Sequence, residues 1–140
     1  MKLSIATLCD RAVVREGLLH ILGAGITNTR TPLPSALQLD VGLMFQLEPS
    51  DGGDHRLSVL LLHEDTGDKV GQVIGLFQIP SEDVTSEKLP LGFAPLTIPL
   101  SAMAVSKAGF YGVTVVLDDE EVARLRLRVF DANEPGGNDA

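Results

Sequence analysis

Residues 108–130 read AGFYGVTVVLDDEEVARLRLRVF and carry the clearest structural signal in the chain. Two runs in which apolar residues alternate with other residues flank an acidic stretch, which is the pattern of a β-hairpin. Because side chains on a strand alternate between two faces, both runs contribute one apolar face. That face consists of Tyr111, Val113, Val115, Leu117, Ala123, Leu125, Leu127 and Val129. We expect it to form one wall of the core.

The register of this hairpin follows from the rule that cross-strand partners lie on the same face of a sheet. Pairing Leu117 with Ala123, and continuing outward along both runs, places all eight apolar residues on one side. This register requires a loop with an odd number of residues, either three (119–121) or five. A two-residue turn would set apolar residues opposite polar ones.

Arg124, Arg126 and Arg128 form a row on the opposite face of the second run, with about 6.6 Å between neighbours. In the predicted register Arg126 lies opposite Thr114 and Arg124 opposite Val116, so the row has no cross-strand acid. We interpret this arginine row as a candidate partner-binding surface for an anionic partner or for an acidic part of another subunit. The alternative is a solvated outer sheet face, or an edge strand that its charge protects against aggregation.

Short strand-like runs recur along the rest of the chain. They cover residues 2–8, 18–29, 36–48, 56–63, 69–79 and 89–98, while 10–17 is expected to be a loop or a short helical turn. No amphipathic run is long enough for a helix of several turns. The pattern predicts an all-β protein, an antiparallel β-sandwich of about seven or eight strands. We expect a single domain over residues 1–131 and a flexible C-terminal tail over 132–140.

Composition restricts the possible partners and the location. The chain has 11 basic and 19 acidic residues, a net charge of −8, which argues against nucleic acid and against an anionic membrane surface. No apolar run reaches the 18 residues of a membrane span, and the apolar run 3–8 is too short for a signal peptide. One cysteine is compatible with a reducing compartment. We therefore expect a cytoplasmic protein.

No catalytic, metal or cofactor site is predicted from the motifs. Cys9 has Arg11 and Arg15 nearby as groups able to lower a thiol pKa, but a buried, inert cysteine is the simpler interpretation. His63, Glu64 and Asp65 are adjacent, yet side chains on a strand alternate in direction and the spacing matches no metal motif. We expect no enzyme.

Two stretches resemble known families. The pattern of residues 109–129, Gly-Phe-Tyr, a Val-x-Val run, an acidic turn and a closing RLRLRV strand, resembles the last hairpin of immunoglobulin-like and C2-like sandwiches. Residues 4–27, SIATLCDRAVVREGLLHILGAGIT, resemble the opening of an uncharacterised bacterial family of small conserved proteins, a domain of unknown function. This resemblance implies a small β-rich domain over nearly the whole chain and implies no activity.

The sequence therefore predicts a non-enzymatic protein-interaction or assembly module of a bacterial cytoplasmic protein. The partner is the chain itself or another protein, bound through a sheet face or edge, with Leu60, Leu62 and Ile74 as candidate contacts beside the arginine row. The alternative is a β-sandwich that binds a small ligand or a carbohydrate, although the chain has no Trp and one Tyr for stacking on sugars. A hydrolase using Cys9 has the least support.

Overall fold

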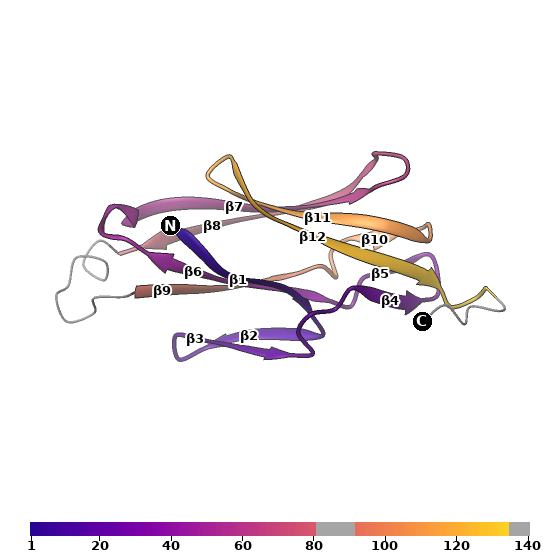
Figure 1. Cartoon of the computed structure of the whole chain (residues 1–140), viewed down its shortest axis with the longest axis horizontal. Helices are drawn as coiled ribbons and strands as arrows, with labels where there is room; N and C mark the ends of the chain where they lie inside the picture. Colours follow the sequence, from indigo (N-terminus) through magenta and orange to yellow (C-terminus); the bar gives the residue numbers. More distant parts are fainter. Residues whose placement is uncertain (81–91, 135–140) are drawn as a thin grey trace.

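The computed structural model describes residues 1–80 and 92–134 (Figure 1). Within them the chain forms twelve strands and one short 3₁₀ helix, η1 (Pro49–Asp51). The strands are β1 (Lys2–Cys9), β2 (Arg11–Arg15), β3 (Leu18–Leu22), β4 (Asn28–Thr31), β5 (Ser35–Ala36), β6 (Asp40–Leu47), β7 (Gly53–His63), β8 (Lys69–Ile79), β9 (Gly92–Pro99), β10 (Ala104–Val105), β11 (Gly109–Leu117) and β12 (Glu120–Asp131). The predicted all-β class is confirmed. The estimate of seven or eight strands was too low, because residues 10–17 were expected to be a loop or helical turn and residues 18–29 a single strand, whereas β2, β3 and β4 form there.

Two sheets pack face to face (Figure 1). One has the order β1-β6-β9, and the other has the order β4-β12-β11-β7-β8. Neighbouring strands are antiparallel except β4, which runs parallel to β12. In the strand letters of the immunoglobulin fold, β1, β6 and β9 correspond to A, B and E, and β12, β11, β7 and β8 to G, F, C and C′. Of the two predicted sandwich types, the chain therefore has the immunoglobulin-like one.

The core lies between these sheets and consists mainly of Val and Leu. Its fully buried side chains include Val41, Leu43 and Phe45 of β6, Leu57, Val59 and Leu61 of β7, and Val113, Val115, Leu127 and Val129 of the β11–β12 hairpin. Each of these contributes about 1.5–3 kcal/mol by leaving water. The residues that we expected on the inner face of the hairpin therefore do form a wall of the core.

Tyr111 ties the start of β11 to the loop before it. Its hydroxyl donates a 2.6 Å hydrogen bond to the carbonyl of Lys107, and its ring is 1% exposed. A tyrosine at the start of strand F that bonds back to the preceding backbone is the tyrosine corner of immunoglobulin-like sandwiches. This contact supports the fold assignment made from the strand order.

The β11–β12 hairpin has the predicted apolar face in a different register. Val115 pairs with Ala123, whereas the predicted register paired it with Leu125. The chain turns at Asp118 and Asp119, both with positive φ (49° and 68°), so the loop has two residues rather than three or five. The mismatch expected from a two-residue turn is removed by a β-bulge that adds one residue to β12.

The predicted loop or helical turn at residues 10–17 is instead the first half of a second hairpin. β2 pairs with β3 through a turn at Glu16 and Gly17, which have φ of 54° and 73°. This hairpin forms a third layer, seen below the β1-β6-β9 sheet in Figure 1. It packs over Gly42 of β6, where a Cβ would make ordinary contacts with Ile21 (3.5 Å) and Ala12 (3.6 Å).

Other predicted segments agree with the structure in outline. β7 and β8 form the predicted hairpin, and β9 is an edge strand as its prolines indicated. Of the predicted flexible tail, residues 135–140 lie outside the described residues. Among the residues that the structure describes, no helix has the length and apolar character needed to cross a membrane.

Candidate protein-interaction surface

The outer face of the β4-β12-β11-β7-β8 sheet carries an apolar patch. Register and burial place five side chains there: Leu60 and Leu62 of β7, Ile74 and Leu76 of β8, and Val116 of β11. Ile74 is 50% exposed and Leu76 is 81% exposed. The structure thus brings together the three contacts named from the sequence and adds Leu76, whose signal was its position two residues after Ile74 on the same strand.

The arginine row borders this patch on the same face. Arg124 lies opposite Thr114, Arg126 opposite Gly112 and Arg128 opposite Phe110. The predicted register had placed Arg126 opposite Thr114, so each arginine lies opposite a residue two positions earlier in β11 than we expected. A Cβ built on Gly112 would meet no described atom within 4 Å, so no side chain fills the sheet surface between the arginine row and the apolar patch at this position.

Two members of the row have acidic partners that the predicted register lacked. The Arg126 guanidinium donates to Glu64 from Nε (3.1 Å) and Nη2 (2.9 Å), and Glu64 belongs to the β7–β8 turn. Arg124 donates to Glu121 from Nε (3.1 Å) and Nη2 (2.8 Å). The bulge in β12 brings Glu121 to the face of Arg124. The expectation that the row has no cross-strand acid holds, because Glu121 lies on β12 itself and Glu64 lies in the β7–β8 turn.

Two of the three arginines of the row, Arg126 and Arg128, pack their guanidinium groups over aromatic rings. The Arg126 guanidinium lies 3.9 Å from the centre of the Phe110 ring. Arg128 contacts two rings, Phe110 at 5.2 Å and Phe130 at 4.5 Å, and makes no ion pair with any described residue. Such cation–π contacts hold a guanidinium in place while leaving its N–H groups free to donate. Arg128 is therefore the member of the row best prepared for an external anion.

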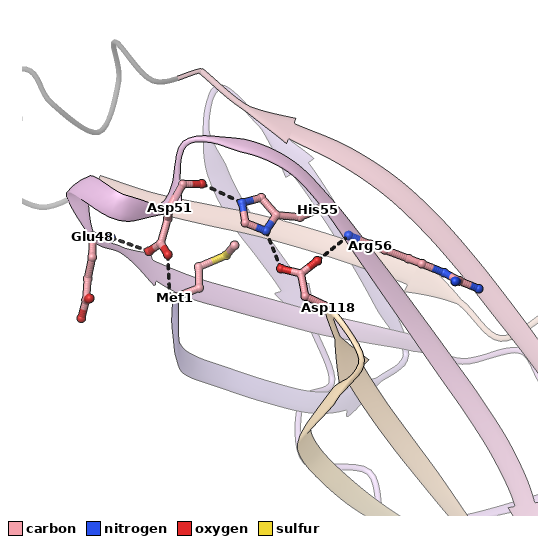
Figure 2. Close-up of polar contacts among 6 residues, drawn as sticks. All are labelled: Met1, Glu48, Asp51, His55, Arg56 and Asp118. Carbon is pink, nitrogen blue, oxygen red and sulfur yellow. Dashed lines mark hydrogen bonds and ion pairs between the residues drawn. The ribbon is translucent and has the colours of Figure 1, made fainter.

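A polar cluster at one end of the sandwich was not found from the sequence. His55 of β7 stands between the β11–β12 turn and η1 (Figure 2). Its Nδ1 lies 2.6 Å from the Asp118 carboxylate and its Nε2 2.6 Å from the Asp51 carbonyl oxygen. Asp51 in turn accepts hydrogen bonds from the amine of Met1 (2.9 Å) and the N–H of Glu48 (2.6 Å). The cluster thus connects three separate parts of the chain.

The partners of His55 determine its charge. A carbonyl and a carboxylate oxygen both accept, so these two partners favour the protonated ring, in which both nitrogens donate. Burial of the ring opposes this charge, but the hydrogen bonds to Asp118 and to the Asp51 carbonyl outweigh burial and raise the pKa of His55. Burial likewise opposes the charge of Asp118, yet the Arg56 N–H and His55 hold the pKa of Asp118 below its ordinary value. Neither nitrogen is free to take a proton, so His55 is suited to linking η1 to the β11–β12 turn rather than to acting as a general base.

Cys9 lies in an environment opposite to that of a reactive thiol. It is fully buried, and its Sγ donates to the Asp40 carbonyl oxygen at 3.4 Å. Burial raises the pKa of the Cys9 thiol, and the nearby charges of Asp40 and Asp10 raise it further. Cys9 is therefore the buried cysteine that the sequence analysis preferred, and neither Arg11 nor Arg15 lowers its pKa.

An open groove lies beside this thiol, between β2 and the β6–β9 pair. Its volume is about 580 Å³, and its polar lining includes Asp10, Arg11 and Gln38. Asp40 lines it too, but its carboxylate already accepts a hydrogen bond from the Ala12 N–H at 2.9 Å. No group of three or more His, Cys, Asp or Glu side chains in the described part of the chain is arranged to hold a metal ion.

These features define a class of protein, an immunoglobulin-like β-sandwich with an apolar, arginine-bordered sheet face. The profile of a family of unknown function, DUF6941, matches residues 4–130, and the chain belongs to that family. The predicted resemblance to a family without known activity is thereby confirmed.

Solved structures with a similar fold are distant in sequence. An immunoglobulin-like protein from Pseudomonas aeruginosa is 11% identical, with a TM-score of 0.44 over 91% of this chain and 94% of that one. A glycosyl hydrolase family 2 member from Bacteroides cellulosilyticus is 14% identical, with a TM-score of 0.33 over 68% of this chain and 12% of that one. No curated protein matches the sequence significantly.

Proposed function

We propose that the chain is a non-enzymatic protein-interaction module that binds its partner through the outer face of the five-stranded sheet. One observation carries the proposal: an exposed apolar patch and a row of oriented arginines share this face. Exposed apolar patches bordered by polar groups mark interaction sites, and arginine and aromatic residues are enriched in such interfaces. The partner that fits has apolar anchors flanked by carboxylates.

The polar clusters support a binding role over catalysis. Both nitrogens of His55 are occupied by acceptors, and Cys9 is buried with a raised pKa. Neither group offers the free base or thiolate that nucleophilic catalysis requires.

Affinity capture from a bacterial extract with three baits tests this proposal. The baits are the wild-type chain, Arg128→Glu, and a control, Arg15→Glu, on the exposed surface of β2. We expect a protein captured by the wild-type and Arg15→Glu baits to be lost with Arg128→Glu. Capture that is the same for all three baits, or no specific capture by the wild type, contradicts the proposal. Equal thermal midpoints of the three baits exclude unfolding as the cause of a loss.

The groove beside β2 favours a second function, the binding of a small polar ligand. Among the described residues, the Asp10 carboxylate is the acidic lining group that accepts no hydrogen bond, so a cationic ligand fits best. Titration with spermidine, followed by NMR, tests this candidate, and Asp10→Asn is the matched variant. Shifts confined to groove residues and lost in Asp10→Asn support it, whereas shifts spread over the acidic surface contradict it. Sugar stacking has no support from tyrosine, because Tyr111 is buried.

A further inference from the structure

Three of the four edge strands of the two sheets carry features that discourage pairing with another chain. β9 contains Pro95 and Pro99, which lack an N–H to donate. β1 has a bulge between Leu3 and Ile5, which disturbs its outline. β4 has four residues and includes Arg30. Short length, charge, proline and bulges are the usual means by which proteins protect sheet edges.

The fourth edge strand, β8, has none of these features over most of its length. It has 11 residues, and after Lys69 it contains neither a charged residue nor a proline. It pairs with β7 in regular register from Gly71 to Ile79, and no other described strand is hydrogen-bonded to it. Its outer edge therefore presents a row of unpaired backbone N–H and C=O groups beside the exposed side chains of Ile74 and Leu76.

The sequence of β8 is chemically symmetric about Gly75. Residues 72–78 read QVIGLFQ. If two copies pair antiparallel about a two-fold axis at Gly75, Ile74 faces Leu76, Val73 faces Phe77 and Gln72 faces Gln78, each twice. Each pair joins two residues of similar chemistry, and the two members of a pair lie on the same face of the sheet, as cross-strand packing requires. In a chain with a net charge of −8, this pairing brings no two charges of the same sign opposite each other.

The centre of this symmetry carries no side chain, because residue 75 is glycine. A Cβ built on Gly75 would meet no atom within 4 Å. The two copies of Gly75 face each other on the axis, so no side chains meet at the closest point. Identical surfaces related by a two-fold axis form a closed dimer rather than a fibre.

We propose that the β8 edge is a self-association site at which two copies of this chain pair antiparallel about Gly75. The two five-stranded sheets then join into one continuous sheet of ten strands. This goes beyond the proposed function, because the edge uses backbone hydrogen bonds and not the arginine row. Either proposal can fail while the other stands.

Crosslinking at Gly75 tests the register directly. Directly opposed residues of an antiparallel pair have Cα atoms about 4.5–5.5 Å apart, within the span of a disulfide. We expect Gly75→Cys to form a covalent dimer in dilute protein under mild oxidation. In the matched control, Gln78→Cys, the two cysteines lie six residues apart along the strands, about 20 Å, and do not crosslink. Equal crosslinking of both variants, or none of Gly75→Cys, overturns the proposal.

Sedimentation velocity tests the association without a crosslink. The wild-type chain is expected to pass from monomer to dimer as its concentration rises. Ile74→Lys places an ammonium against Leu76 of the other copy at two symmetric positions and weakens the dimer about tenfold or more. Leu22→Lys, at a 66% exposed position of the β2–β3 hairpin, leaves the dimer unchanged. A wild type that stays monomeric at all concentrations overturns the proposal, as does equal weakening by both variants.

Discussion

Thr114 carries a buried hydroxyl on β11 that has no hydrogen-bond partner among residues 1–80 and 92–134. A polar group in this position lowers stability, because it has left water without a replacement contact. We expect Thr114→Val to raise the free energy of unfolding by up to about 1 kcal/mol, measured by urea denaturation.

The same substitution at Thr97 provides the control. The Thr97 hydroxyl donates to the Ala12 carbonyl at 3.2 Å and so joins β9 to the β2–β3 hairpin. We expect Thr97→Val to lower the free energy of unfolding by about 1 kcal/mol. Equal losses in the two variants would contradict the assignment of Thr114 as unsatisfied.

His55 gives stability a dependence on pH in the neutral range. Its pKa is raised in the folded chain, so its contribution is complete below the ordinary value of 6.5 and is lost as the pH rises through the folded pKa. We expect His55→Gln to lower the free energy of unfolding by about 1 kcal/mol at pH 6, and this difference to shrink toward pH 8.5. Urea denaturation at several pH values measures both effects.

His20→Gln serves as the control, because His20 is exposed on β3. We expect this variant to change the free energy of unfolding by no more than about 0.5 kcal/mol, as is usual for an exposed position. The lowered pKa values of Asp51 and Asp118 affect stability at acid pH instead. Their contribution to the free energy of unfolding is present above the ordinary value of 3.8 and is lost as the pH falls through the folded pKa. A difference between wild type and His55→Gln that stays constant from pH 6 to 8.5 would show that the ring is not an imidazolium.

At the residue scale, the sequence predicts the face of a side chain but not its partner. The two-residue period correctly placed the arginine row opposite the core, because alternation is a property of any strand. The Glu64 partner of Arg126 lies 62 residues away, so only the fold brings the two together. The cluster around His55 could not be predicted for the same reason, because His55 and Asp118 are 63 residues apart in the sequence.

At the element scale, the β11–β12 hairpin shows why register is hard to predict. Requiring apolar residues to share a face fixes only whether the paired residue numbers sum to an even or odd value. Turn and bulge then select among the allowed registers. Here two aspartates in left-handed conformation close a two-residue turn, and Val122 is the extra residue of the bulge. Neither is readable from alternation.

That turn supplies a prediction at the same scale. Positive φ at both central residues is what a type I′ turn requires, and glycine adopts it with less strain than aspartate. We expect Asp119→Gly to stabilise the chain by about 0.5–1 kcal/mol, measured by thermal unfolding. Asp118→Gly gains the same relief but loses the contacts to His55 and Arg56, so we expect net destabilisation. Stabilisation by Asp118→Gly would argue against a stabilising role for the Asp118 contacts to His55 and Arg56.

At the scale of the whole molecule, frequent short apolar runs predicted a sandwich, because each strand must bury one face against a second sheet. The strand order was not predictable. β4 pairs in parallel with β12, about a hundred residues later, and the β2–β3 hairpin interrupts the path between the two sheets. Such long-range pairings leave no local pattern in the sequence.

The reactivity of the Cys9 thiol measures whether the layers of the fold stay packed together. The thiol is fully buried beside Asp40 of β6, where β1 passes into the β2–β3 hairpin. Alkylation therefore requires the layers to separate, and we expect the reaction with iodoacetamide at neutral pH to follow the population of open molecules. Its rate should rise with urea in parallel with unfolding. Leu22→Cys, which adds an exposed thiol, should gain one rapidly modified site. Rapid alkylation of Cys9 in the folded wild type would contradict this and reopen the possibility of thiol chemistry.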